Sequence, residues 1–278
     1  MHLEIDPRLA ARGLTTFADI FEHPEAEIIS GHPTRNVARL VIGTERLFLK
    51  RQLRIPWKDY WHSWQAGFGL VDRSRREWQT LLALRRHGLS CPEPLAVGFD
   101  GKRSFLLVRE LENAADLHTF LARHGHDQRI RECLAERLGG FLARFHGLGF
   151  IHPDLYAKHV FVRRSDWDIA LIDFQRTTRY RFVPWHARWR DLAALDASLG
   201  EDMFDESLRY RLLETYLQNV RARNRLVEAM RAVRRRSRYL QQRRKIQAMR
   251  HPWRFVAEPN RLESAALPMA DLAVEGAP

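Results

Sequence analysis

The chain has 278 residues, 45% hydrophobic and 29% charged, which is enough apolar sequence for one large domain or two lobes. Its formal net charge of +12 points to an anionic partner. Two cysteines are too few for a disulfide scaffold, and no apolar run reaches the length of a membrane span. Secreted disulfide-rich, membrane-spanning, collagenous and wholly disordered classes are therefore excluded. With so few cysteines a reducing compartment is expected, and the opening MHLEIDPRLAARG lacks the apolar region of a secretory signal.

The N-terminal part is predicted to be rich in β-strands. Apolar or alternating runs, separated by glycine and proline, predict strands over residues 26–30, 37–43 and 45–50. Apolar side chains at helical spacing then predict a helix over residues 73–88 that ends at Gly88. The stretch EPLAVGFDGKRSFLLVREL follows as two strands joined by an Asp-Gly turn.

The pattern becomes helical after Leu111. Apolar residues recur every three or four positions in ADLHTFLARHG and in DQRIRECLAERLGGFLARFHGLG. A β-hairpin is predicted next, with HVFV at 159–162 and DIALIDF at 168–174 as its strands. Further helices are predicted over residues 187–199, 204–219 and 220–248. This order of elements predicts a two-lobed α+β phosphotransferase, with an N-lobe over residues 1–110, a C-lobe over 111–250 and a flexible tail over 251–278.

Two carboxylates stand out in the segment FIHPDLYAKHVFVRRSDWDIALIDFQR. Asp154 follows a predicted helix, and Asp173 ends the second strand of the hairpin, 19 residues later. Since a hairpin returns the chain beside its start, both acids are expected at the opening of one cleft. Phosphoryl transfer uses such a pair, because one carboxylate orients the attacking hydroxyl and takes its proton while another holds the metal on the phosphates.

The same segment resembles the protein-kinase pattern H-R-D-x-x-x-x-N followed by D-F-G. Two further kinase parts occur in the correct order. Lys50 ends the predicted third strand, where it would hold the α- and β-phosphates, and Glu77 lies on the next helix, where it would pair with Lys50. The slots of the pattern are filled by His152-Pro153-Asp154, His159 and Asp173-Phe174-Gln175. A protein-kinase-like fold is therefore expected, with a small β-rich N-lobe and a larger helical C-lobe.

A narrower resemblance covers about residues 25 to 215. HPDLYAKHVF followed by LIDFQR resembles the lipopolysaccharide kinases of Gram-negative bacteria, the Kdo/WaaP group, whose loop has a form like H-R-D-x-Y-x-x-H-F and whose metal stretch reads I-D-hydrophobic-x-R. LFLKRQ, the tryptophan-rich PWKDYWHSW, RREW and RWRDLAAL are similar to that family as well. The matching positions are Tyr156, His159, Ile172, Asp173 and Arg176.

This resemblance implies ATP-dependent phosphoryl transfer to a sugar hydroxyl of the lipopolysaccharide inner core, with heptose as the expected acceptor. It implies Asp154 as the catalytic base, with His152 and His159 in the catalytic loop. It also implies Asp173 as the Mg²⁺ ligand. His159 replaces the usual Asn, so it either joins that metal or donates a hydrogen bond to phosphate or to Asp154, since Mg²⁺ prefers oxygen ligands.

For the nucleotide, the resemblance implies a phosphate-holding ion pair between Lys50 and Glu77. Backbone groups of the link from Glu110 to Glu112 would contact adenine, as in kinase hinges. The expected glycine-rich loop is nearly absent, because ISGHPTRN contains only Gly31. Phosphate contacts there would come from its Thr, its Arg or backbone amides.

Two segments each allow two interpretations. Trp57, Trp61 and Trp64 lie with Tyr60 and Phe68 at helical spacing, either as an aromatic core patch or as a surface for lipid A, sugar or a membrane. The segment from Asn219 to Arg250 is strongly basic and is either a solvated helix face or a surface for anionic lipid.

The expected partners are a lipopolysaccharide or lipid A core acceptor and an anionic membrane surface, in the cytoplasm or at the inner face of the inner membrane. One alternative is another small-molecule kinase of this fold, of the Kdo or aminoglycoside type. A second is a degenerate relative that binds nucleotide or lipid without turnover. A nucleic-acid-binding protein is not expected, because the basic charge alone leaves the acid pair and Lys50 unexplained.

Overall fold

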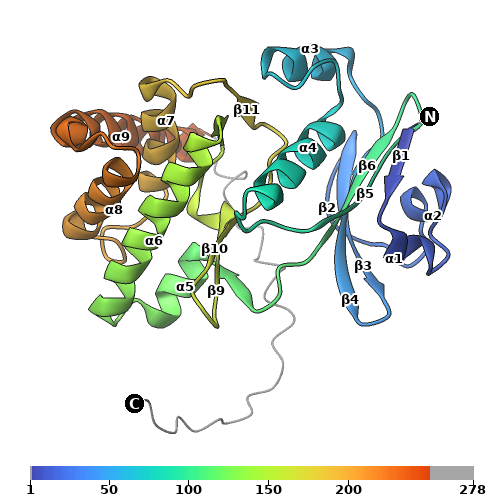
Figure 1. The fold of residues 1–278 in the computed structure, drawn as a ribbon, viewed down its shortest axis with the longest axis horizontal. Helices are drawn as coiled ribbons and strands as arrows, with labels where there is room; N and C mark the ends of the chain where they lie inside the picture. The colour runs from blue at the N-terminus through green and yellow to red at the C-terminus, as the bar shows by residue number, and fades with distance from the viewer. Residues whose placement is uncertain (1, 251–278) are drawn as a thin grey trace, which may run out of the picture. The chain divides into compact units, whose positions relative to one another are not determined.

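The computed structural model describes residues 2–250 and has the expected mixed α+β architecture, a small antiparallel sheet followed by a helical part (Figure 1). Residues 1–241 form one compact unit; of the second unit, 242–278, the described residues 242–250 continue the last helix. The predicted tail over 251–278 lies outside the described residues. Strand-rich elements come first: β1 His2–Ile5, α1 Pro7–Ala10, α2 Phe17–Phe21, β2 Glu27–His32, β3 Arg35–Ile42, β4 Glu45–Gln52, α3 Trp57–Gln65, α4 Arg73–Arg86, β5 Pro94–Phe99 and β6 Ser104–Arg109.

The remaining elements belong mostly to the helical part. They are β7 Ala114–Asp116, α5 Leu117–His124, α6 Gln128–Gly147, β8 Phe150–Ile151, η1 Ala157–His159, β9 Val160–Arg163, β10 Ile169–Leu171, β11 Thr178–Arg179, α7 Trp185–Asp196, α8 Glu206–Asn219, η2 Arg223–Arg225 and α9 Leu226–Arg250. No helix among residues 2–250 combines the length and the apolar character that a bilayer crossing requires.

The N-terminal sheet has six strands in the order β1-β5-β6-β4-β3-β2 (Figure 1). The strands predicted from the alternating runs are all present, and the turn after β5 contains Gly101 in the left-handed region at φ 98°. Strand β1 was not predicted; it pairs with β5 and forms one edge of the sheet. All neighbouring strands of this sheet are antiparallel.

Strand β4 separates two apolar layers. Leu47 and Leu49 are buried in a cluster with the side chains of α1 and α2. Because successive side chains of a strand point to opposite faces, Phe48 and Lys50 face the other side, where Phe48 packs against the main core that contains α4. This alternation directs the Lys50 amine toward α4.

Helix α4 presents one face to the sheet. Glu77, Leu81 and Leu84 lie at positions i, i+4 and i+7 and are all buried. Asp72 caps the helix by accepting hydrogen bonds from two backbone amides, and Gly88, in the left-handed region at φ 66°, follows its end. The helix predicted over 73–88 is confirmed. Glu77 is the buried carboxylate of this helix.

The helical part is organised around α6 and α8. At Gly139 of α6, an added Cβ would lie only 2.5 Å from the carbonyl oxygen of Leu212, so the two helices approach as closely as their backbones allow. The predicted hairpin forms as β9 and β10, with Val160 opposite Leu171, and β7 extends it on the other side. This packing holds the segment that leads from β8 into the hairpin.

Helix α3 contradicts the aromatic core interpretation. Trp57, Trp61 and Trp64 are exposed to 74%, 46% and 54%, whereas Asp59 and Ser63 on the opposite face are buried. The reason is polar anchoring, because Asp59 accepts hydrogen bonds from the side chains of two neighbouring segments. Of the predicted aromatic cluster, Phe68 does pack against the core.

Candidate active site

The sheet and α4 together form an ion pair. Lys50 Nζ donates to Glu77 Oε1 at 2.6 Å, as predicted, and the Glu77 side chain is only 2% exposed. Burial acts to lower the pKa of Lys50, but the nearby carboxylates of Glu77 and Asp173 outweigh it and hold this pKa above its usual range. The amine therefore stays charged at neutral pH and can attract phosphate.

Glu77 also reaches the loop that follows the hairpin. Its Oε1 atom accepts a second hydrogen bond, from the backbone amide of Phe174 at 3.3 Å. The preceding residue, Asp173, has φ 63°, a left-handed conformation that is uncommon for a residue with a Cβ. Phe174 is fully buried in the main core. One carboxylate thus fixes both the strand amine and the loop that carries Asp173.

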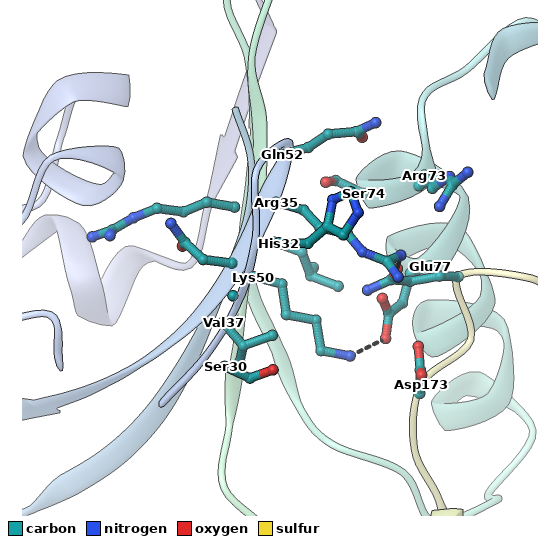
Figure 2. A pocket seen from close by; sticks show the side chains of 15 residues that line it. Ser30, His32, Arg35, Val37, Lys50, Gln52, Arg73, Ser74, Glu77 and Asp173 are labelled. Atoms are coloured by element: carbon teal, nitrogen blue, oxygen red, sulfur yellow. Dashed lines mark hydrogen bonds and ion pairs between the residues drawn. The ribbon is translucent and has the colours of Figure 1, made fainter. Parts of the chain in front are cut away.

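Lys50, Glu77 and Asp173 line one cavity of about 290 Å³. Figure 2 shows Lys50 extending from the sheet, Glu77 from α4 and Asp173 from the loop, all toward the same space. Arg35, on the hairpin between β2 and β3, also lines the cavity and donates to the side chain of Gln175 at 3.3 Å. The hairpin with few glycines therefore contributes a guanidinium, and not only backbone groups, to the cavity.

Asp173 is held in its ionised form. Burial acts to raise its pKa, but the Lys50 ammonium and the Arg35 guanidinium help to keep the pKa of this carboxyl below its usual range. An ionised carboxylate facing a cation-rich cavity is the donor that a hard divalent cation prefers.

The loop that begins at His152 is held in place by hydrogen bonds of that residue. The backbone amide of His152 donates to the buried carboxylate of Asp191 on α7 at 2.5 Å. The His152 ring is itself buried, and its Nε2 atom donates to the carbonyl oxygen of Ile172 at 3.0 Å. These contacts tie the start of the loop to the end of the hairpin. His152 is therefore a positioning residue, which acts through the backbone of this loop.

Asp154 and Asp173 are linked through His159. The Nδ1 atom of His159 donates to the backbone carbonyl of Asp154 at 2.7 Å, and its Nε2 atom lies 4.0 Å from Asp173 Oδ2. Burial, the largest effect, lowers the pKa of His159 below its usual range, so the ring is neutral and its Nε2 lone pair faces Asp173. The His159 ring thus lies between the Asp154 backbone and the Asp173 carboxylate, although Asp154 does not line the cavity that Asp173 lines, so the common opening of the two acids stays a prediction.

The Asp154 carboxylate has a partner that sequence reasoning did not assign. Arg176 Nη1 donates to both of its oxygens, at 2.9 and 3.2 Å, while the Arg176 side chain is 67% exposed. Arg176 was recognised as a matching position of the metal stretch, but nothing in the pattern showed which group it contacts. A contact between two loops depends on the path of the folded chain.

The link residues are placed apart from this cavity. Glu110 and Glu112 are not among its lining residues, and neither is Asp154. The backbone amide of Glu110 already donates to the carbonyl oxygen of Arg46 at 2.9 Å, which continues the pairing of β4 with the link. The Glu110 amide is therefore already paired and Glu112 is exposed, while contact of the link's backbone groups with adenine stays a prediction.

The donor groups fit a metal that is shared with phosphate. Among residues 2–250, no cluster of three or more His, Cys, Asp and Glu side chains could hold a metal ion alone. Mg²⁺ is commonly held by one or two carboxylates together with substrate phosphates. Asp173, with the His159 Nε2 lone pair beside it, meets that requirement.

The family model of the lipopolysaccharide kinase (Kdo/WaaP) family matches residues 22–216. The chain belongs to this family. Its members are kinases, so this protein is a phosphotransferase that acts on an alcohol group of a lipopolysaccharide core sugar. The resemblance found from the motifs is thereby confirmed.

Two kinds of relative are similar to this chain. The lipopolysaccharide core heptose(I) kinase WaaP of Pseudomonas aeruginosa is 25% identical over 198 residues, 66% of this chain and 74% of that protein. A 3-deoxy-D-manno-octulosonic acid kinase of Xanthomonas oryzae pv. oryzae is 35% identical over 136 residues. That match covers 46% of this chain and 50% of the relative, so the chain spans half the length of this second kinase.

A solved structure described as WaaP in complex with acyl carrier protein has the same fold. Its TM-score is 0.69 and its sequence identity 21%, with 86% of this chain and 99% of that chain covered. The two-lobed kinase-like architecture is therefore confirmed by comparison as well as by its elements.

Proposed function

We propose that the protein transfers the γ-phosphate of ATP to a hydroxyl of an inner-core heptose of lipopolysaccharide. The observation that carries this proposal is the convergence of Lys50, Glu77 and Asp173 on one cavity, with Asp154 joined to the same site through His159. A strand amine, a helix carboxylate and two loop carboxylates are the parts that phosphoryl transfer requires.

The residues divide the chemistry between them. Lys50, held by Glu77, binds the phosphates of the nucleotide, and Asp154 orients the acceptor hydroxyl and takes its proton. Asp173 and His159 would hold Mg²⁺, which supplies neutralisation of phosphate charge when bound. His152 positions the loop through its contacts with Asp191 and Ile172.

Arg176 is the cation closest to the proposed base. In the free protein the Arg176 guanidinium neutralises the Asp154 carboxylate. Because the Arg176 side chain is exposed, it can turn toward a transferred phosphate when the acceptor hydroxyl takes its place at Asp154. We propose that Arg176 exchanges partners in this way during each turnover.

Heptose is favoured because the match with WaaP covers most of both chains. The second candidate acceptor is 3-deoxy-D-manno-octulosonic acid, favoured by the 35% identity with the kinase of Xanthomonas oryzae pv. oryzae. Both acceptors would use the same residues for phosphoryl transfer, so contacts with the acceptor sugar would decide between them.

The site of action proposed is the cytoplasmic face of the inner membrane, because a lipopolysaccharide acceptor is anchored in a bilayer. A carrier protein is a further candidate partner, since the similar solved structure is that of WaaP with acyl carrier protein. Co-purification of tagged full-length protein tests that partner directly.

The test of the function is transfer of labelled phosphate from ATP to core acceptors that carry either heptose or 3-deoxy-D-manno-octulosonic acid. We expect label on heptose, and we expect Asp154→Asn to lower turnover by about 10² to 10⁴-fold because the proton acceptor is lost. Binding of ATP, measured by thermal stabilisation with Mg²⁺, should persist in that variant. Label on 3-deoxy-D-manno-octulosonic acid alone would establish the second candidate, and label on neither would contradict both.

A further inference from the structure

Helix α3 has the reverse of the usual polarity of a surface helix. Its buried stripe consists of Asp59, Ser63 and Ala66, at positions i, i+4 and i+7. Its exposed stripe consists of Trp57, Trp61 and Trp64, at the same spacing on the opposite side; we name this stripe the tryptophan face. A surface helix ordinarily turns its apolar side inward, so this face requires an explanation other than core packing.

The orientation of α3 is fixed by buried polar contacts. Asp59 is 1% exposed and accepts from Gln52 Nε2 at 2.6 Å and from Arg73 Nη2 at 2.9 Å. Turning the helix to bury the tryptophans would break both bonds. On the outer side, the rings of Trp61 and Trp64 stack with centroids 4.9 Å apart, which keeps them together as one projecting surface.

The charges around the tryptophan face have one sign. Within residues 53–70 the only acidic side chain is Asp59, which is buried, whereas Arg54 and Lys58 are exposed. The segment 178–182 bonds to the end of this helix through the Arg179 amide and the Ala66 carbonyl, at 2.8 Å, and it contains no acid either. That segment adds two exposed arginines and Phe182, which is 80% exposed.

We infer that the tryptophan face is a membrane-docking surface that inserts its indole rings into the interface of a bilayer containing anionic lipid. Trp is the side chain that prefers the membrane interface, and neighbouring cations are attracted to anionic headgroups. The net charge of +12 acts in the same direction over longer distances. Figure 1 shows α3 at the rim of the sheet beside α4, the helix that carries Glu77, so docking there would bring the nucleotide cavity close to the lipid surface.

This inference rests on the proposed function, because docking on a membrane would bring the enzyme to an acceptor that is anchored there. The test uses full-length protein and vesicles of phosphatidylcholine with and without phosphatidylglycerol. Wild type should co-sediment with the anionic vesicles, and its tryptophan emission should shift to the blue. The variant Trp57→Gln/Trp61→Gln/Trp64→Gln should lose binding by about tenfold or more, without the blue shift.

Two matched variants sharpen this test. Val41→Gln/Val227→Gln removes two exposed apolar side chains elsewhere and should bind vesicles as wild type does. Arg235→Gln/Arg236→Gln removes charge from α9, whose side chains there are exposed, and should reduce binding less than the tryptophan variant. The inference is overturned if the tryptophan variant binds like wild type, if loss occurs only in the α9 variant, or if the tryptophan variant changes the oligomeric state without vesicles.

Activity separates this inference from the proposed function. On a core oligosaccharide freed of lipid, the tryptophan variant should phosphorylate at the wild-type rate, and on lipopolysaccharide in vesicles it should be slower. Equal slowing on both acceptors would contradict the inference. If wild type labels no core sugar, the proposed function fails, while vesicle binding still reports on the tryptophan face.

Discussion

Two carboxylates of the candidate site, Glu77 and Asp154, are paired in opposite ways. Glu77 is buried against Lys50 by a sheet on one side and a helix on the other. Asp154 lies on a loop and is paired with Arg176, most of whose side chain is in solvent. The first pair is built into the packing of the N-terminal part, and the second can be broken at low cost.

This contrast indicates a division of tasks. A group that must hold phosphate in the same place at every turnover benefits from a rigid, desolvated partner. A base must release its partner before it can accept a hydroxyl, so an exposed and replaceable cation suits it better. Three changes test whether the two pairs differ in this way.

The largest effect is expected from Lys50→Met. Because it leaves the Glu77 carboxylate buried without its cation, we expect a loss of about 3–5 kcal/mol in the free energy of unfolding. Turnover should fall by about 10² to 10³-fold, since a charged donor to the phosphates is removed. Urea unfolding and labelled-ATP assays measure both.

The matched control for that change is Arg8→Met. Arg8 is 54% exposed and pairs with Asp6 and Glu93 at the surface, so its loss should cost no more than about 1 kcal/mol. Equal losses in the free energy of unfolding of the two variants would show that burial does not make the Lys50 pair more stabilising than a surface pair.

A smaller effect is expected from Arg176→Ala. Stability should change by less than about 1 kcal/mol, because the pair is exposed. Turnover should fall on the order of tenfold, about 1.4 kcal/mol of transition-state stabilisation. In an Asp154→Asn background the same change should add little, since both residues act on one step. Independent, multiplying losses of turnover would refute the coupling of Arg176 to Asp154.

The smallest effect concerns pH, through His159, which lies between the two acids. Its pKa is lowered by burial below the ordinary value of 6.5, so the unfolded chain binds the proton at a higher pH than the folded protein does. Stability is then complete above pH 6.5 and declines as pH falls below it. His159→Gln should flatten the fall in melting temperature between about pH 7 and about pH 5. The remaining slope is expected from His146, whose pKa is lowered by burial in the same direction.

Much of the sheet and of this site could be predicted, because the signals are local. Alternation along β4 places Lys50 on the face opposite Leu49, and helical spacing in α4 places Glu77 on the face of Leu81. The hairpin predicted between Asp154 and Asp173 likewise forms, as β9 and β10. These patterns depend on the period of one element at a time, so no knowledge of the tertiary path was needed.

The rest depends on contacts between distant segments. Strand β1 is only four residues long and gains its place by pairing with β5. The pairing of Arg176 with Asp154 arises because two loops meet, and no spacing rule predicts it. On α3 both stripes have helical period, so the pattern could not say which faced inward; the buried bonds of Asp59 decide it.

The shared oxygen of Glu77 gives the molecule a built-in reporter. The Phe174 amide can stay protected from hydrogen–deuterium exchange only while α4 and the loop that carries Asp173 remain in contact. Any compound that displaces that loop must expose this amide and, at the same time, disturb the Glu77 oxygen that also accepts from Lys50. A single backbone resonance would thus distinguish compounds that only fill the cavity lined by Lys50, Glu77 and Asp173 from those that disrupt it.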